Sequence, residues 1–214
     1  GDINFYSSEN LNELRSIRDL DVPVTTLALS NNGTTLLVGA GTTEGRPLLY
    51  NAVTRKQLRK MPELNNPIRF SLINDKDDTG ILAEKDGFVS LIALPQGDEL
   101  KNFRIRGQEI SCIVFSANGQ ELLVGTKSEQ GKGSLFRYTI LSGALENVLI
   151  DLPDEISSIA QRDSANMLVA LKSGDILIYK DLELVDNLSL KNVSDYVLTS
   201  NYLNAAKASK IISG

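Results

Sequence analysis

A glycine followed five residues later by a bulky residue recurs along the whole chain, and this spacing limits the possible folds more than any other feature. Successive glycines are 44, 42, 46 and 41 residues apart, and each opens a run of β-prone residues. The runs are Gly1–Tyr6, Gly45–Tyr50, Gly87–Ile92, Gly133–Tyr138 and Gly174–Tyr179. A repeat of this length indicates a row of similar units, although helical repeats share it.

The interior of each unit indicates β-structure. Upstream of the glycine lies an apolar run such as Leu36–Val38, and before it a turn cluster such as Asn31–Gly33. Asn and Gly accept positive φ and favour tight hairpins. A β-prone run such as Val24–Leu29 comes earlier, and a polar segment such as Arg55–Met61 follows the bulky residue. Four strands joined by hairpins therefore predict an antiparallel meander in each unit.

These units resemble the WD-repeat family, in which the third strand of a blade ends in a Trp-Asp pair. The Trp position is occupied here by Tyr6, Tyr50, Ile92, Tyr138 and Tyr179. The Asp position is occupied by Ser7, Asn51, Ala93, Thr139 and Lys180. Leu29–Gly33 and Phe115–Gly119 resemble the family's turn between the first two strands. The resemblance implies a β-propeller. The Trp-Asp pair and the Gly-His signature are absent, so the family's usual side-chain network cannot form.

We therefore expect an all-β fold, a β-propeller of about five four-stranded antiparallel blades in a single domain over residues 1–214. The blade units are expected at residues 24–61, 67–105, 109–150, 155–191, and 193–214 with 1–20. In that last, shared blade, Asp2–Tyr6 and Leu11–Ile17 join strands near Tyr196–Thr199 and Lys207–Ser213, which avoids unpaired edges. The alternative is an incomplete ring whose open ends are filled by another chain or by further sequence.

Composition limits the chemistry that this chain can perform. It has no histidine, one cysteine and a net charge of −5. Without histidine, a Ser-His-Asp or Cys-His site cannot form, and the commonest metal ligand is missing. We therefore expect no catalytic residue, no metal site and no cofactor. The negative charge argues against nucleic-acid binding, and no apolar run is long enough for membrane insertion.

The single cysteine, Cys112, lies in the apolar run Ile110–Phe115. This position predicts a buried structural thiol rather than a nucleophile. A lone cysteine excludes an internal disulfide and agrees with a reducing compartment. We therefore expect an intracellular protein, cytoplasmic or nuclear.

Two connections between second and third strands are long and polar, at residues 39–44 and 125–132. In propellers of the WD-repeat family the corresponding loops lie on the face most often used for partners. We expect partner-binding residues in these loops, projecting from one face. They are Thr42, Thr43, Glu44, Lys127, Glu129 and Lys132. A tolerated surface insertion is the alternative.

A basic cluster falls on the outer segments of two neighbouring units and suggests a patch for an acidic partner. Its residues are Arg55, Lys56, Arg59, Lys60, Lys101, Arg104 and Arg106. An ordinary solvated outer strand is the alternative, and we favour it.

These features predict a non-catalytic scaffold for protein–protein interaction within a larger, multi-subunit intracellular complex. The main rival is a ligand- or carbohydrate-binding propeller of lectin type, whose units have similar length. Lectin sites usually repeat one aromatic and polar set in every unit, whereas these loops differ from one another. The second rival is an enzyme with carboxylates that converge at a central channel, where the sequence alone cannot place them.

Overall fold

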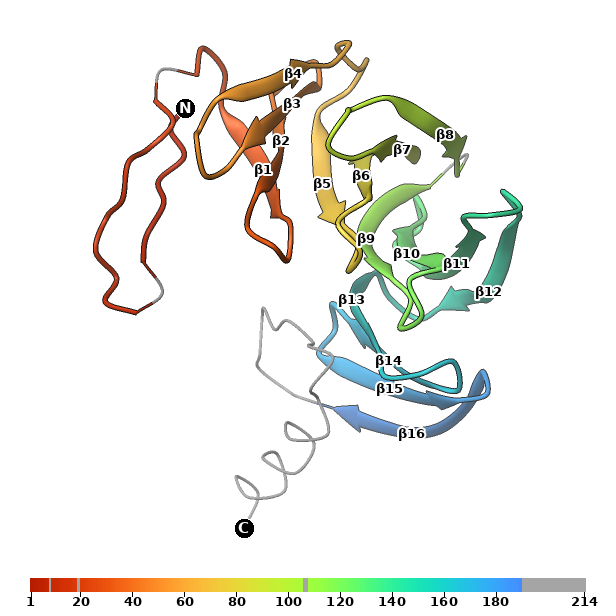
Figure 1. The fold of residues 1–214 in the computed structure, drawn as a ribbon. Coiled ribbons are helices and arrows are strands. Elements are labelled where there is room, and N and C mark those ends of the chain that lie inside the picture. The colour runs from red at the N-terminus through yellow and green to blue at the C-terminus, as the bar shows by residue number, and fades with distance from the viewer. Residues whose placement is uncertain (8, 19, 106–107, 190–214) are drawn as a thin grey trace. The chain divides into compact units, whose positions relative to one another are not determined.

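A computed structural model describes residues 1–7, 9–18, 20–105 and 108–189 of the chain (Figure 1). The described residues form sixteen β-strands and no α-helix. The strands make four antiparallel sheets of four, each in sequence order. The chain divides into two compact units, Gly1–Arg106 (unit 1) and Gly107–Gly214 (unit 2).

Each unit contains two of the sheets. In unit 1, sheet 1 comprises β1 (Val24–Leu29), β2 (Thr35–Ala40), β3 (Arg46–Asn51) and β4 (Gln57–Lys60). Sheet 2 comprises β5 (Ile68–Ile73), β6 (Thr79–Glu84), β7 (Phe88–Ala93) and β8 (Glu99–Arg104). In unit 2, sheet 3 comprises β9 (Glu109–Phe115), β10 (Glu121–Lys127), β11 (Gly133–Thr139) and β12 (Leu145–Leu152). Sheet 4 comprises β13 (Ile156–Gln161), β14 (Asn166–Leu171), β15 (Asp175–Lys180) and β16 (Glu183–Ser189).

The expected all-β meander of four-stranded antiparallel units is confirmed, but the expected number of blades is not. The described residues form four sheets rather than five, and no sheet is closed. The N-terminal half of the expected shared blade is a hairpin with antiparallel bridges Ile3–Ile17 and Tyr6–Glu13. Its C-terminal half, residues 193–214, lies outside the described residues. The single domain over residues 1–214 and the closure of a ring stay predictions.

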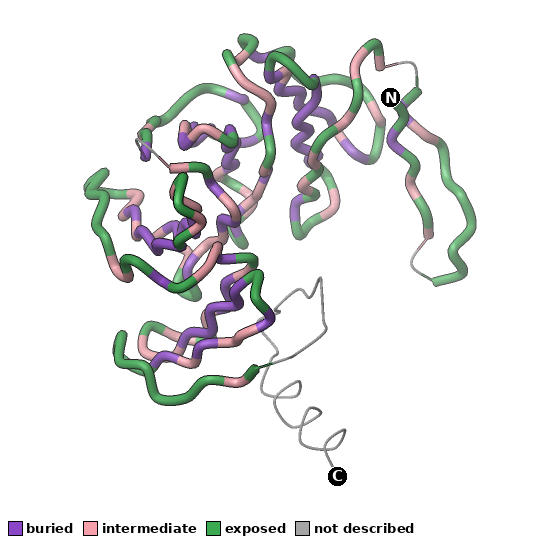
Figure 2. The backbone as a smooth tube through the Cα atoms, turned by 180° about the vertical axis from the view of Figure 1, so that it is seen from behind, coloured by how far each residue is buried: buried purple, intermediate pink, exposed green. Residues whose placement is uncertain are grey.

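Burial follows strand position within each sheet. All six residues of β2 are buried, whereas all four residues of β4 are exposed. Figure 2 shows the same gradient from the middle strands to the outer strand of each sheet. The second and third strands are covered on both faces, which explains their continuous apolar runs. The outer strand has one partner strand and faces water, so charged residues are stable there.

The first strand of every sheet carries an irregularity at the same place. The register skips one residue near the start of that strand: Thr25, Arg69, Ser111 or Ser157. An extra residue on one strand of an antiparallel pair bends that strand and increases its twist. Its recurrence shows that the four sheets are structural repeats and that positions in one sheet can be matched to positions in another.

The two sheets of each unit meet over a glycine. In unit 1, a Cβ at Gly39 of β2 would lie 2.6 Å from Cγ2 of Thr26 and 2.7 Å from Cγ2 of Ile68. Ile68 belongs to the neighbouring sheet, so a side chain at Gly39 would push the sheets apart. The register places Gly125 of β10 at the matching position of unit 2.

A polar network lies at one end of sheet 2. Asn66 donates its backbone N–H to Oε2 of Glu84 at 2.9 Å and its side-chain amide to Oδ2 of Asp86 at 3.1 Å. Arg104 pairs with the same Asp86 carboxylate. Glu84 is buried, and burial raises the pKa of its carboxyl group. The network links the entry to β5 with the turn between β6 and β7.

Candidate functional site

The structure places the predicted loop residues at the ends of two hairpins. Thr42, Thr43 and Glu44 are exposed between β2 and β3. Between β10 and β11, Glu129 and Lys132 are exposed, and Lys132 lies 3.6 Å from Asp151. The loops are shorter than expected, because β2 extends to Ala40 and β10 extends to Lys127.

Lys127 therefore ends a strand, where its Nζ lies 3.5 Å from Oε2 of Glu155. The expected loop residues belong to different units, with residues 42–44 in unit 1 and residues 127–132 in unit 2. Their projection from one common face stays a prediction.

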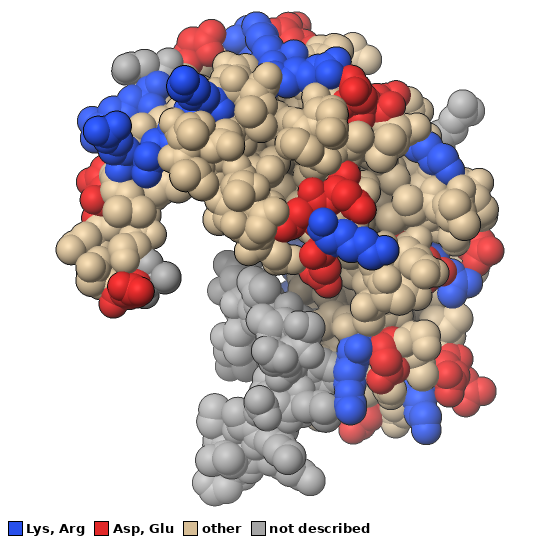
Figure 3. Space-filling model, viewed as in Figure 1, with Lys and Arg blue, Asp and Glu red and all other residues tan. Residues whose placement is uncertain are grey.

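The predicted basic cluster lies on β4, β8 and the turn before β4 in unit 1, with Arg106 outside the described residues. Figure 3 shows Lys and Arg side chains gathered over β4 and the N-terminal segment. Several of the arginines have structural partners. Arg59 contacts Asp98 at 2.6 Å, Arg104 pairs with Asp86, and the Arg55 guanidinium lies 5.4 Å from the ring centroid of Phe5. These contacts satisfy part of the charge, which favours the solvated-strand interpretation.

Cys112 is buried in β9, and burial raises the pKa of its thiol to about 12. A thiol with this pKa is almost entirely protonated at neutral pH and is a poor nucleophile. Among the described residues, no three His, Cys, Asp or Glu side chains gather as a metal site. The described part of the chain also contains no helix long and apolar enough to cross a membrane.

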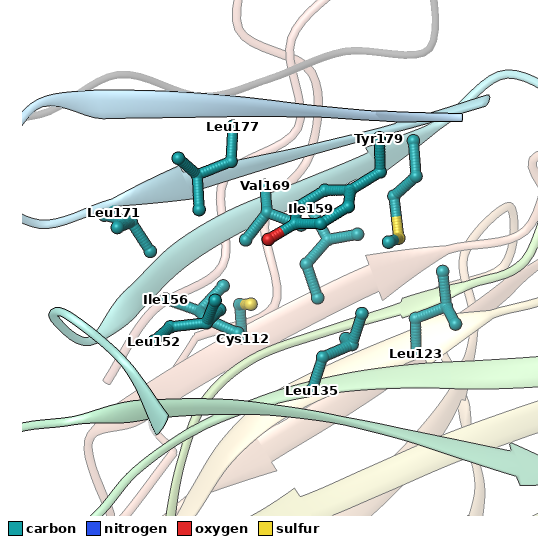
Figure 4. Packing of buried hydrophobic residues seen from close by; sticks show 11 residues of the cluster. Cys112, Leu123, Leu135, Leu152, Ile156, Ile159, Val169, Leu171, Leu177 and Tyr179 are labelled. Atoms are coloured by element: carbon teal, nitrogen blue, oxygen red, sulfur yellow. The ribbon is translucent and has the colours of Figure 1, made fainter. Parts of the chain in front are cut away.

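Sequence reasoning missed a cleft of 370 Å³ between the two sheets of unit 2. Its apolar wall is formed by Leu123, Val148, Met167 and Tyr179. Figure 4 shows Leu123 and Tyr179 toward one end of the core between these sheets, with Leu171 toward the other. The cleft continues this core outward at the Leu123 end.

The edge of the cleft is polar. It lies at the start of β10, the end of that strand that is farther from the β10–β11 loop. Asn118, Glu121, Gln161 and Asp181 line it together with Arg137. Gln161 bridges the two sheets, because its Oε1 accepts the backbone N–H of Ala117 at 3.0 Å. The cleft is therefore lined by both apolar and charged groups.

Arg137 is the central charge of the cleft. Its Nη2 donates to Oε2 of Glu146 at 2.7 Å, and its Nε lies 3.7 Å from Oε1 of Glu121. The hydrogen bond to Glu146 is the main cause of the raised pKa of the Arg137 guanidinium. Its Nε is buried without a hydrogen-bond partner among the described residues. Asp181 forms no ion pair with a described residue, so the carboxylates outnumber the cation here.

A sequence signal for this cleft exists in the glycine repeat. The fourth residue after the repeat glycine is Leu49, Leu91, Arg137 or Ile178 in the four sheets. The seventh is Ala52, Leu94, Ile140 or Asp181. One charged residue stands among apolar ones at each position, and both line the cleft.

Comparison with known proteins identifies a fold but no family. No family model matches the chain, and no curated protein matches it. Among solved structures, the chain is similar to the one titled "Structure of U3-55K", with a TM-score of 0.69 and 12% sequence identity. The match covers 86% of this chain and 56% of that chain. The similarity supports a WD-like propeller fold.

Proposed function

We propose that this chain is a non-catalytic scaffold for protein–protein interaction, a WD-repeat-like propeller that works within a larger intracellular complex. The repeated architecture supports this function most directly. Four similar sheets bury their central strands and leave short polar hairpin loops exposed. Exposed loops on a rigid β-scaffold are common positions for recognition, since they can vary without changing the core.

The chemistry of the side chains also supports binding over catalysis. The chain has no histidine, and its one cysteine is buried with a pKa of about 12. The chain therefore has no histidine to act as a base, and its cysteine is a poor nucleophile. We propose that the protein works without a metal or a cofactor. Elemental analysis that found a stoichiometric transition metal would contradict this.

The scaffold proposal is tested by placing a photocrosslinking amino acid at Thr43 or Glu129 and exposing the full chain to native extract. We expect each position to crosslink a reproducible set of proteins. A matched probe at Leu141, which is exposed on the β11–β12 turn, is the control. Charge reversal at Glu44 and Lys132 should reduce the crosslinked set without changing the melting temperature. Crosslinking that is equal at all three positions would contradict loop-based recognition.

A further inference from the structure

The space between sheets has a counterpart in each unit, and the two counterparts differ in chemistry. In unit 1, Leu49 of β3 pairs in register with Leu37 of β2. In unit 2, Arg137 of β11 pairs in register with Leu123 of β10 at the matching place. Leu49 is 0% exposed and belongs to the inter-sheet core, whereas the Arg137 side chain is 36% exposed. An arginine thus stands at a position that the sister unit uses for packing.

A second apolar position has changed in the same way. The backbone N–H of Leu94 donates to the Asp78 carbonyl at 2.9 Å, and that of Asp181 donates to the Ala165 carbonyl at 2.8 Å. The two residues therefore occupy equivalent places after β7 and β15. Leu94 is buried in the core of unit 1, whereas Asp181 is exposed at the cleft.

The turn after the third strand also differs between the units. In unit 1 it packs on the core, because a Cβ at Gly97 would lie 3.4 Å from Cδ2 of Leu49. In unit 2 it is a two-residue turn in which Asp181 and Leu182 have φ of 50° and 65°. Positive φ disfavours a bulky residue such as leucine. Leu182 is half exposed and lines the cleft.

Three changes thus distinguish this inter-sheet space from its counterpart in unit 1, where Leu49 and Leu94 are buried. Apolar residues at these positions pack well in unit 1, so the fold does not require charges there. Perturbed packing, unbalanced charge and backbone strain that coincide at one concave surface indicate a binding site. The volume of 370 Å³ lies within the range of about 300–1,000 Å³ that is typical of ligand pockets.

We propose that this cleft binds an extended peptide segment in which a Lys or Arg stands beside an aliphatic residue. The proposal rests on the scaffold function and names a place and a partner class for it. The aliphatic side chain packs on Leu123 and Met167. The peptide cation lies between the carboxylates of Glu121 and Asp181. These two negative charges exceed the single positive charge of Arg137, so the cleft attracts a cation.

Two amides at the cleft edge favour a peptide backbone as the bound group. In their hydrogen bonds with described residues, Asn118 and Gln161 use their side-chain oxygens. Their amide NH₂ groups have no acceptor among these hydrogen bonds, and both residues line the cleft. A peptide carbonyl is the matching acceptor.

The chain contains two methionines, and they provide a reporter and an internal control. Met167 lines the cleft, whereas Met61 is buried in the core of unit 1. The full chain is labelled with ¹³C at the methionine methyls and titrated with pools of acetylated, amidated heptapeptides. One pool carries a central Arg–Leu pair, a second Glu–Leu and a third Arg–Ser. We expect the Arg–Leu pool to shift the Met167 signal saturably and to leave Met61 unchanged.

Carboxylate variants test the assigned contacts. In E121Q/D181N, half-saturation should require about ten times more Arg–Leu peptide, since a charged hydrogen-bond partner is lost. The control D151N/D186N neutralises two exposed carboxylates of unit 2 outside the cleft and should bind as wild type.

Three outcomes would overturn the proposal: no pool shifts Met167, the Glu–Leu pool shifts it equally, or E121Q/D181N binds as wild type. If one of these outcomes is found but proteins still crosslink at Thr43 or Glu129, the peptide cleft is wrong and the scaffold function is still supported.

Discussion

Ile156, the first residue of β13, packs directly on the backbone of Gly125 in β10. A Cβ at Gly125 would lie 2.8 Å from Cγ2 of Ile156 and 2.5 Å from Sγ of Cys112. The first distance spans the boundary between sheets 3 and 4, and the second lies within sheet 3. A real Cβ does not come so close to other atoms. The distance between sheets 3 and 4 therefore depends on residue 125 being a glycine, which has no Cβ.

The substitution Gly125→Ala should lower the free energy of unfolding by about 1–3 kcal/mol, because it overpacks a closed core. Urea unfolding at constant pH measures the change. The control Asn147→Ala, on exposed β12, should change stability by less than about 0.5 kcal/mol. The double variant Cys112→Ala/Gly125→Ala should be less destabilised than the sum of its single variants, because the thiol clash is removed. Additive effects would show that Cys112 does not crowd this position.

The strand order was predictable from the sequence, but the role of Gly125 was not. The repeat glycines predict the third strands, and β3, β7, β11 and β15 overlap the predicted runs, each ending one residue beyond its run. The sequence predicts a polar loop that starts at Gly125, because glycine next to Thr126 and Lys127 is typical of a turn. Its strand position depends on the skipped residue Ser111, which shifts the register between β9 and β10. Such irregularities depend on packing between distant segments and carry little local signal.

Cys112 should be inert toward a water-soluble disulfide reagent in the native protein. Burial raises its pKa to about 12, so at pH values near 8 very little thiolate exists, and the sulfur is shielded as well. One thiol per chain should react after unfolding in urea, since the chain has one cysteine. Absorbance of the released thiolate measures both rates. Rapid stoichiometric labelling without denaturant would contradict the buried position.

The raised pKa of Glu84 predicts how stability depends on pH. The pKa of Glu84 in the folded state lies above its pKa in the unfolded state. Protonation of Glu84 therefore adds to the free energy of unfolding, and the added stability is fully present below the unfolded pKa. It is lost as pH rises through the folded pKa. In Glu84→Gln the amide oxygen can still accept the Asn66 N–H without a charge. The variant should therefore be more stable than wild type at neutral pH, and the difference should vanish below about pH 4.

Urea unfolding of both proteins at several pH values measures that difference, with Glu9→Gln as an exposed control. A less stable variant at neutral pH would show that ionised Glu84 stabilises its network, and a pH-independent difference would show that folding does not raise the pKa of Glu84.

The candidate sites were predictable only in part, for a related reason. The sequence identified Glu44 and Lys132 as loop residues because polarity and glycine content are local properties. Arg137 was not singled out, because a lone arginine in a β-prone run is typical of a solvated strand face. Its importance depends on matching it to Leu49, which requires the register of both units. A comparison of equivalent positions after each repeat glycine would have detected it.

Copying unit 1 into the cleft separates a structural role of its charges from a binding role. Leu49 and Thr35 of unit 1 match Arg137 and Glu121 by register, so the variant is Arg137→Leu with Glu121→Thr. The variant removes the Arg137–Glu121 ion pair, with N···O 3.7 Å, and the Arg137–Glu146 ion pair, with N···O 2.7 Å. It supplies a leucine side chain of the kind that the sister unit buries completely. Apolar replacement of a partly buried ion pair is often stabilising. The free energy of unfolding should therefore rise by about 1 kcal/mol. Half-saturation of the Met167 methyl shift should require at least about ten times more Arg–Leu peptide, because Glu121 is lost and an apolar side chain replaces the charged wall of the cleft.

Urea unfolding and the methyl titration on the same samples provide both measurements. The single variant Glu121→Thr is the matched control, because it leaves Arg137 paired with Glu146 alone. A double variant that is less stable than wild type would show that the charges hold sheets 3 and 4 together. A gain in stability with loss of binding would mean that this unit keeps a less stable interior in order to recognise a ligand, as expected for a functional site.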